Sequence, residues 1–330
     1  MIATPESRCD RVVAVILSLF MTVPYASAKD DYPRQTVKIV VPFVAGGGVD
    51  IVARLVGPRL SELLGQSIVI ENRGGAGGAL GASAVAQAAP DGYTLLLGTG
   101  STHGTNSSIY ARLSYDPVRD FVPVALLSTS PLVLVANPAV PANSAQELIA
   151  LAKAKPGQLG FGSYGPGSIN HLAGELFNSL GAIQTNHIPY RGSAPMMTDL
   201  IGGRIDYAFD GVSTSLGYIQ AKSVKMLGTT GTSRSPLHPN EPTITESALP
   251  GFDAMVWFGL FAPAGTPKPI VDMLNGKVNV ALAAPAVRAG LEKLGFEPVG
   301  GGPEVLAQKV ESEMQKWVKI VREKNIRVDQ

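Results

Sequence analysis

The amino-acid sequence predicts an α/β protein in which open, mainly parallel sheets flanked by helices form two lobes. Apolar runs rich in β-branched residues alternate with amphipathic segments, and short glycine-rich loops join them; this pattern is typical of parallel α/β sheets. The order of strand, glycine loop and helix begins again after Ser144. Without an N-terminal export signal, about 300 residues remain, too many for most single hydrophobic cores. Two lobes are therefore expected.

The opening unit runs from Val37 to Leu64. Val37–Phe43 is an apolar run, glycines follow at 46–48, and Asp50 begins an amphipathic segment, which together predict a strand, a loop and a helix. Glycines let a ligand approach the main chain closely, and N–H groups at a helix N-terminus favour an anion. We expect an anion-binding loop here. Asp50 is either an ordinary helix-start acid or a ligand residue that acts through water.

The later elements follow the same logic. Apolar runs predict strands at 68–70, 93–97, 121–127, 132–135, 159–163, 205–209, 224–228 and 256–261. Amphipathic runs predict helices at 79–89, 144–155, 168–180 and 194–201, and further helices from 268 to nearly the end. We expect 98–104 to be a polar loop that lines a site. Ser128–Pro131 separates two predicted strands and is expected to be one crossing between the lobes. The other crossing is expected near Asp253–Phe258.

Several blocks stand out along the chain, in the order Pro42–Arg54, Glu71–Gly78, Pro90–Leu95, Tyr115–Phe121, His171–Phe177 and Ile188–Gly192. Together they resemble the motifs of the Bug family, the periplasmic solute receptors associated with tripartite tricarboxylate transporters. The resemblance covers the whole mature chain. It implies a type II-like periplasmic binding protein fold with a ligand cleft between the lobes. Lobe I is then expected at 29–130 plus 256–330, where the C-terminal tail returns to it, and lobe II at 131–255.

The N-terminus predicts export to the periplasm. Arg8 and Arg11 precede an apolar run at 12–23 that is too short to span a bilayer, and Ala26–Ala28 is a small-x-small end, as in a cleavable secretory signal. Cleavage after Ala28 removes the single cysteine, Cys9, and excludes disulfides and cysteine chemistry from the mature chain. The net charge of +1 argues against a nucleic-acid partner.

Motifs for catalysis and cofactors are mostly absent. Gly160–Gly165 fits G-x-G-x-x-G, but its first glycines lie inside a predicted strand and no acid is placed to hold a ribose,. No serine has the spacing of a nucleophile elbow,, and the four histidines lack zinc-site spacing,. We expect no cofactor, no metal and no enzymatic activity. The alternative is a secreted α/β enzyme, hydrolase-like, that uses the same cleft.

The candidate ligand residues follow the predicted strands, because ligands bind at the carboxyl ends of strands in open α/β sheets. The candidates in the first lobe are Phe43, Ala45, Gly46, Gly47, Gly48, Asp50, Ser101 and Thr102. The candidates in the second lobe are Ser163, Gly167, Ser168, His171, Tyr190, Arg191, Gly192 and Asp210.

Besides Asp50, three of these candidates have more than one interpretation. Arg191 is the obvious partner for a carboxylate, yet the resemblance implies that main-chain amides of the opening loop and bridging waters hold the ligand. We expect the backbone loop to contribute first and Arg191 second. His171 is either a ligand contact or a packed structural residue. Asp210 ends its predicted strand at the cleft and is either a site residue or structural.

These observations predict a periplasmic solute-binding receptor. It is expected to be a monomer that captures a small carboxylated metabolite between its lobes. The resemblance implies delivery of this solute to the membrane subunits of a tripartite tricarboxylate-type transporter or to a sensor. The sequence does not distinguish a dicarboxylate from an amino acid, an aromatic acid or an uncharged metabolite.

Overall fold

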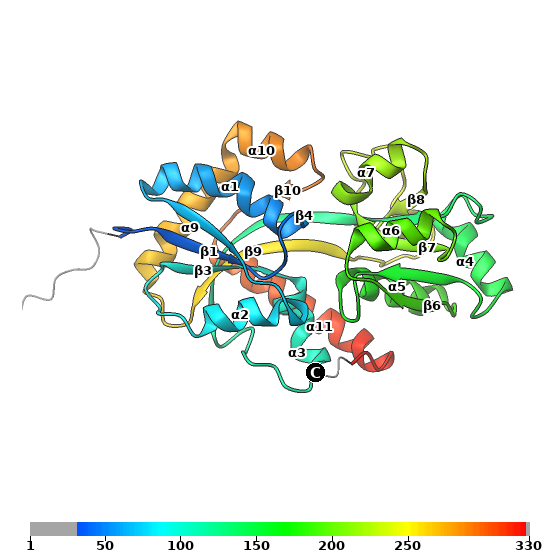
Figure 1. The fold of residues 1–330 in the computed structure, drawn as a ribbon, viewed down its shortest axis with the longest axis horizontal. Helices are drawn as coiled ribbons and strands as arrows, with labels where there is room; N and C mark the ends of the chain where they lie inside the picture. The colour runs from blue at the N-terminus through cyan, green and yellow to red at the C-terminus, as the bar shows by residue number, and fades with distance from the viewer. Residues whose placement is uncertain (1–31, 328–330) are drawn as a thin grey trace, which may run out of the picture. The chain divides into compact units, whose positions relative to one another are not determined.

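A continuous sheet organises residues 32–327, the part of the chain that the computed structural model describes. Its ten strands include the series β2-β1-β3-β9-β4-β7-β5-β6, with β8 and β10 paired to β4 (Figure 1). The strands are β1 (Val37–Val41), β2 (Ile68–Asn72), β3 (Thr94–Thr99), β4 (Phe121–Ala136), β5 (Gly160–Ser163), β6 (Asn186–Pro189), β7 (Tyr207–Gly211), β8 (Lys225–Thr229), β9 (Met255–Pro263) and β10 (Glu297–Pro298). The expected signal peptide at 1–28 lies outside the described residues.

Parallel pairing occurs in two groups of strands, β2-β1-β3 and β6-β5-β7. We call the first group and its helices the first half, and the second group, with β8 and its helices, the second half. Helices of the first half are α1 (Gly48–Leu64), α2 (Ala79–Ala86), α9 (Lys268–Ala283) and α10 (Pro285–Glu292). Helices of the second half are α4 (Ala145–Ala154), α5 (Ile169–Gly181), α6 (Ser193–Ile201), α7 (Val212–Gln220) and α8 (Ile244–Ser247). Within each half the expected parallel order is found.

Two long strands join the halves. β4 has 16 residues and pairs antiparallel with β9 along the first half and across the junction, then with β7 and β8 in the second half (Figure 1). The prediction of separate strands at 121–127 and 132–135 is therefore wrong. Pro131 ends the pairing with β9, and Pro123 lies at a register shift. Proline lacks an N–H and is tolerated at such irregular places of a ladder.

The predicted loop at 98–104 is also different. β3 continues to Thr99, and a π-helical turn, η2 (Ser101–Thr105), leads directly into the short helix α3 (Asn106–Ile109). The Thr99 N–H donates to Thr102 Oγ1 over 2.9 Å, which closes the turn. Side-chain hydrogen bonds of this kind stabilise turns locally, and glycine content alone did not reveal it.

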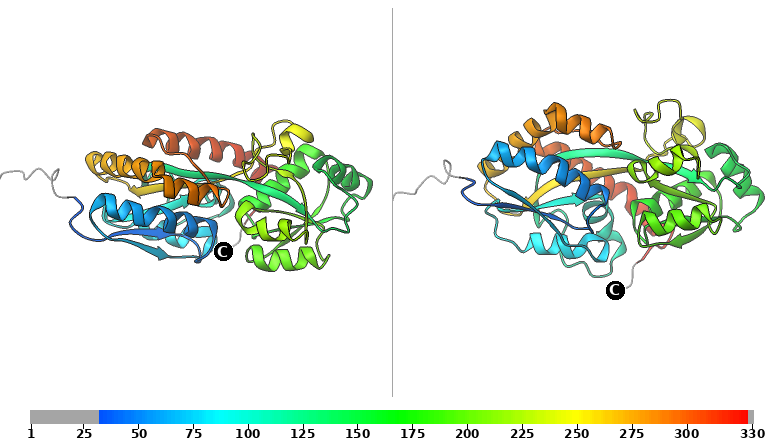
Figure 2. Two further views of the ribbon diagram at one scale, coloured as in Figure 1. Left: turned by 90° about the horizontal axis from the view of Figure 1, so that it is seen from above. Right: turned by 45° about the horizontal axis from the view of Figure 1, so that its top comes forward.

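The C-terminal segment packs on both halves. α9 and α10 contact α1, as the expected return to the first lobe requires. The last helix, α11 (Pro303–Glu323), contacts different cores along its length (Figure 2). Leu306 and Val310 join the first-half core around Phe261, whereas Trp317 and Ile320 join the second-half core. The return is therefore only partial, because α11 spans both cores.

Within residues 32–327, no single helix is both long and apolar enough to cross a membrane. α9 and α10 taken together reach the required length and composition, but the chain bends by 71° between them.

We expect Trp317→Ala to lower the free energy of unfolding by about 3–5 kcal/mol. The Trp317 side chain is fully buried, and its Nε1–H donates to the buried Glu313 carboxylate over 2.8 Å. Urea denaturation at pH 7 measures the change. Lys319→Ala, at an exposed position of the same helix, should change stability by less than about 0.5 kcal/mol. Equal losses in the two variants would show that α11 does not stabilise the second half in this way.

Candidate functional site

The first-half loop ends at the N-terminus of α1. Gly47 is the N-cap residue, and no side chain caps the helix, so the first-turn N–H groups have no intrahelical acceptor. Val44, Ala45 and Gly46 are exposed. Gly46 has a φ of +86° and requires glycine. Gly47 has a φ of −78°, which any residue adopts. The loop thus presents main-chain donors on an exposed surface.

Asp50 lies beneath this loop and is buried. Its carboxylate accepts hydrogen bonds from Gly46 N–H (2.9 Å), Arg54 Nε (2.9 Å) and Asn72 Nδ2 (3.0 Å). Burial alone would raise the pKa of Asp50, but these hydrogen bonds and the Arg54 charge hold it below its ordinary value. The Gly46 N–H is therefore used within the protein. Asp50 fixes the loop from inside, and the donors left for a ligand are those around Gly47 and Gly48.

The other first-half candidates are partly enclosed. Thr102 is buried, and its hydroxyl contacts Thr99 and the His103 ring. Ser101 is half-buried on the same turn. The half-buried Phe43 ring lies against Gly78, where a Cβ would come within 3.2 Å of it. Thr102 thus shapes the turn, while Ser101 and Phe43 retain accessible surface.

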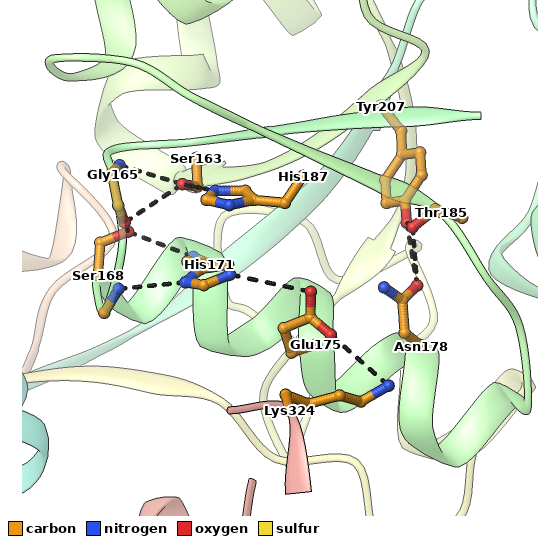
Figure 3. A network of polar contacts seen from close by, with 11 residues as sticks. Ser163, Gly165, Ser168, His171, Glu175, Asn178, Thr185, His187, Tyr207 and Lys324 are labelled. Atoms are coloured by element: carbon orange, nitrogen blue, oxygen red, sulfur yellow. Dashed lines mark hydrogen bonds and ion pairs between the residues drawn. The ribbon is translucent and has the colours of Figure 1, made fainter. Parts of the chain in front are cut away.

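The loop between β5 and α5 is held by a polar network (Figure 3). Ser168 caps α5 by accepting from the His171 N–H over 3.3 Å, and the Gly167 N–H donates to His171 Nδ1 over 3.1 Å. Ser163 Oγ lies 2.6 Å from His187 Nε2. His187 stacks on His171 with ring centroids 3.7 Å apart. Ser163, Gly167, Ser168 and His171, predicted from sequence, are thus brought together, and all four shape this loop.

The histidine pair is kept neutral by its surroundings. Burial, reinforced by the neighbouring His187, lowers the pKa of His171 to about 3, and burial lowers that of His187 to about 4. His171 Nε2 faces Glu175 at 3.8 Å, and Glu175 in turn pairs with Lys324 after α11. Burial raises the pKa of Glu175. The sequence analysis missed His187 and Lys324, because no local pattern relates either residue to α5.

A serine next to a histidine invites comparison with a hydrolase. Ser163 is fully buried, and its hydroxyl also accepts from the Gly165 N–H over 3.0 Å. His187 packs between Ser163 and His171. The pair is thus committed to holding the loop. In residues 32–327 no group of three His, Cys, Asp or Glu side chains could hold a metal ion.

We expect the protein to lose stability as the pH falls below 6.5. Below pH 6.5 the His171 side chain takes up a proton in the unfolded chain, whereas in the folded protein it stays neutral until about pH 3. The stability of the folded state is therefore highest above pH 6.5 and declines as the pH falls toward the folded pKa. His171 alone accounts for about 2 kcal/mol between pH 7 and pH 5. Urea denaturation at both values should show a smaller loss in His171→Gln than in the parent. Lys319→Ala should keep the parental loss; an unchanged loss in His171→Gln contradicts the assignment.

Asp210 is the penultimate residue of β7 and is fully buried. Tyr164, Ser193, Thr214 and Ser215 donate their hydroxyl hydrogen bonds to its carboxylate. It therefore joins the β5–α5 loop to the first turns of α6 and α7. Its burial places it behind the surface that these hydroxyl groups form.

The remaining second-half candidates follow β6. Tyr190 donates to Asp199 over 2.9 Å. Arg191 is exposed, and no ion pair is described for it in residues 32–327. Gly192 has a φ of +127° and is the N-cap of α6, which no side chain caps. Arg191 is thus a cation beside a second open helix N-terminus.

Two contacts show that these loops face the first half. Thr105 Oγ1, in the turn after β3, donates to the Gly167 carbonyl over 3.4 Å. Gly295, after α10, lies against Val212 at the start of α7, where a Cβ would meet Val212 at 2.7 Å. The carboxyl ends of the parallel strands of the two halves are therefore turned toward each other. This is where open α/β sheets bind ligands.

Comparisons with known proteins agree with this arrangement. The sequence model described as "Tripartite tricarboxylate transporter family receptor" matches residues 52–326. BugT of Bordetella pertussis is 37% identical over 95% of this chain and 97% of its own. The solved structure "R. palustris Rpa4515 with adipate" superposes with a TM-score of 0.83 at 38% identity, covering 90% of this chain and 99% of that one. MatC from Rhodopseudomonas palustris with bound malate gives 0.79 at 38% identity, with 88% and 100% covered.

Proposed function

The chain belongs to the tripartite tricarboxylate transporter family receptors, a family of periplasmic solute-binding proteins, and we propose that it binds a small dicarboxylate between its halves. Its α/β fold, with a mixed sheet flanked by helices, is similar to that of periplasmic binding proteins, and we place the ligand cleft between the two halves. Adipate and malate are the bound molecules named for two similar structures. Both are dicarboxylates, which supports this ligand class here.

The uncapped N-terminus of α1 is the observation that carries the proposal. A carboxylate taken from water needs several hydrogen bonds to offset its desolvation. The N–H groups around Gly47 and Gly48 supply them, and the helix dipole favours the negative charge. Asp50 accepts only the Gly46 N–H of this loop, so the N–H groups of Gly47 and Gly48 remain for the ligand. In this proposal Asp50 does not itself contact the anion. Water between Asp50 and the ligand remains part of the proposal.

The second carboxylate goes to the second half. Arg191 and the open N-terminus of α6 at Gly192 lie together there. A charge-assisted hydrogen bond from arginine suits a carboxylate. Ser101, Gly167, Ser168 and Tyr190 border the same cleft in this proposal, and His171 acts by holding Gly167.

The proposal also covers where the receptor is located and to which partner it delivers its solute. The chain is exported to the periplasm and its signal peptide is removed after Ala28. The mature monomer delivers its solute to the membrane subunits of a tripartite transporter or to a sensor. We take the lobes as 29–130 plus 256–330 and 131–255, and α11 packs on the cores of both. Membership of the tripartite tricarboxylate transporter family receptors supports this role.

A thermal-shift screen of the mature chain tests the ligand class. Dicarboxylates that include adipate and malate should raise the melting temperature, because a ligand present at 100 times its Kd adds about 2.7 kcal/mol of stability. Amino acids, aromatic acids and sugars complete the panel. A shift confined to uncharged compounds contradicts the proposal, and turnover of any bound compound favours the hydrolase-like alternative.

We expect Gly47→Val to abolish binding of the dicarboxylate found in that screen. Gly47 has ordinary backbone angles, and only the Val44 carbonyl, at 3.8 Å, approaches an added Cβ, so the fold tolerates the change while the side chain blocks the loop. Calorimetry measures the affinity. Gly276→Val, at a site on α9 with open space, is the control and should bind like the parent.

Arg191→Ala should weaken the same binding by about 1–3 kcal/mol, the contribution of a hydrogen bond to a charged group. Calorimetry at low and moderate salt separates this contact from general charge attraction. If Gly47→Val binds like the parent while Arg191→Ala loses all binding, a salt bridge replaces the backbone loop as the main anchor.

A further inference from the structure

The hydroxyl groups around Asp210 form a wall at the carboxyl ends of the second-half strands. Ser193 Oγ donates to the Asp210 carboxylate over 3.1 Å, Thr214 Oγ1 over 2.9 Å and Ser215 Oγ over 2.5 Å. The Tyr164 hydroxyl donates to the other carboxylate oxygen. In residues 32–327 no ion pair links Asp210 to a cation. The acid is instead surrounded by hydroxyl groups.

Two features stabilise a negative charge at this place. α6 begins at Ser193 and α7 at Val212, so both helix N-termini lie beside the carboxylate and their dipoles favour it. Hydroxyl hydrogen bonds to an ionised group are stronger than those between neutral groups. The Asp210 carboxylate is thus held by hydroxyl donors and two helix N-termini, and a carboxylate only accepts hydrogen bonds.

The hydrogen bonds to Asp210 determine what the surrounding hydroxyl groups can still donate or accept. A hydroxyl has one hydrogen to donate and two lone pairs to accept. The single hydroxyl hydrogen of Thr214 can go to the Asp210 carboxylate or to the Gly211 carbonyl, each 2.9 Å from its Oγ1. Both acceptors belong to the protein, so in neither case is the hydrogen left for a ligand. Ser215 is fully buried, whereas Tyr164, Ser193 and Thr214 are half-buried. Because their hydrogens are directed to Asp210 or the Gly211 carbonyl, these three hydroxyl groups can offer a ligand lone pairs but no hydrogen,.

This wall lies where the ligand is proposed to bind. Tyr164 follows β5, Ser193 follows β6, and Thr214 follows β7. Val212, on the same turn as Thr214, touches Gly295 of the first half, so this edge faces the other half. Ser193 is two residues from the cation Arg191.

We propose that Asp210, acting through Ser193, Thr214 and Tyr164, makes this wall an acceptor surface that selects carboxylates carrying a hydroxyl group. The inference rests on the proposed function, because it concerns the same cleft. The ligand's hydroxyl donates to the wall, and its second carboxylate, which has only acceptors, goes to Arg191 and the α6 N-terminus. Asp210 is a positioning residue that does not touch the ligand.

Matched ligand pairs test the proposal. Each pair differs by one hydroxyl group: L-malate and succinate, 3-hydroxybutyrate and butyrate, mandelate and phenylacetate. Calorimetry on the mature chain measures both members, and the pair that binds most tightly is used. The parent should bind the hydroxylated member about tenfold more tightly, the value of roughly one net hydrogen bond.

Asp210→Asn should reduce this preference to about threefold or less. The amide donates to some of the hydroxyl groups and frees their hydrogens, so the wall no longer presents only acceptors. A purely structural role would weaken both members of the pair equally and keep the ratio. Asp206→Asn is the control: Asp206 precedes β7 at the opposite end and accepts from the Gly160 N–H over 2.7 Å. Its variant should keep the parental ratio.

The outcomes distinguish failure of carboxylate binding from failure of the preference for a hydroxyl group. If no dicarboxylate of the thermal-shift screen binds the parent, the proposed function itself fails; if one binds but no member of any pair does, the selection is overturned. If carboxylates bind but the parental ratio is near one, or Asp210→Asn keeps the parental ratio, the selection is overturned and the receptor role stands. Ser193→Ala provides a second variant if Asp210→Asn does not fold. It removes one acceptor and should also lower the ratio, and an unchanged ratio overturns the inference.

Discussion

The antiparallel pairing of β4 with β9 is the constraint on which the rest of the structure depends. Both strands continue from the first half to the junction, and β4 alone continues to pair with β7 and β8. Main-chain hydrogen bonds therefore fix how the parallel strands of the two halves are placed, with their carboxyl ends opposed. α11 adds a side-chain connection, since Val310 packs in one core and Trp317 in the other. A ligand that draws the halves together must act against these connections, so its differential affinity sets how far they move.

Each half holds a buried acid next to a helix that begins after a glycine. Asp50 lies under the loop before α1 and is balanced by Arg54, while Asp210 lies before α7 and is balanced by hydroxyl groups. Both carboxylates are satisfied from inside the protein. Their negative charges therefore lie inside the protein and not on the surfaces of the two halves that face each other, and their hydrogen bonds hold the loops in place. The groups left toward the cleft are main-chain N–H groups, hydroxyl lone pairs and the exposed Arg191, a set suited to holding an anion.

Much of the fold could be predicted because its signals are local. The unit from Val37 to Leu64 forms the predicted strand, loop and helix, and Ser144 and Ser168 cap α4 and α5 where the sequence placed the helix starts. The prediction failed where a distant partner overrides a local signal. Ser128–Pro131 has the composition of a break, yet residues 128–131 remain in β4 because they pair with Met255–Phe258. The turn after β3 is helical because Thr102 closes it.

By itself, the sequence determined most of the segments that are strands and helices, where glycine loops follow strands, and the family to which these loops belong. Those properties depend on neighbours along the chain, through periodicity, capping and turn chemistry. Only the tertiary structure decided which way the polar side chains face. It placed Asp50 and Asp210 inside, stacked His187 on His171, and brought Lys324 to Glu175. These contacts join residues from different elements, and their geometry depends on how β4, β9 and α11 bring those elements together.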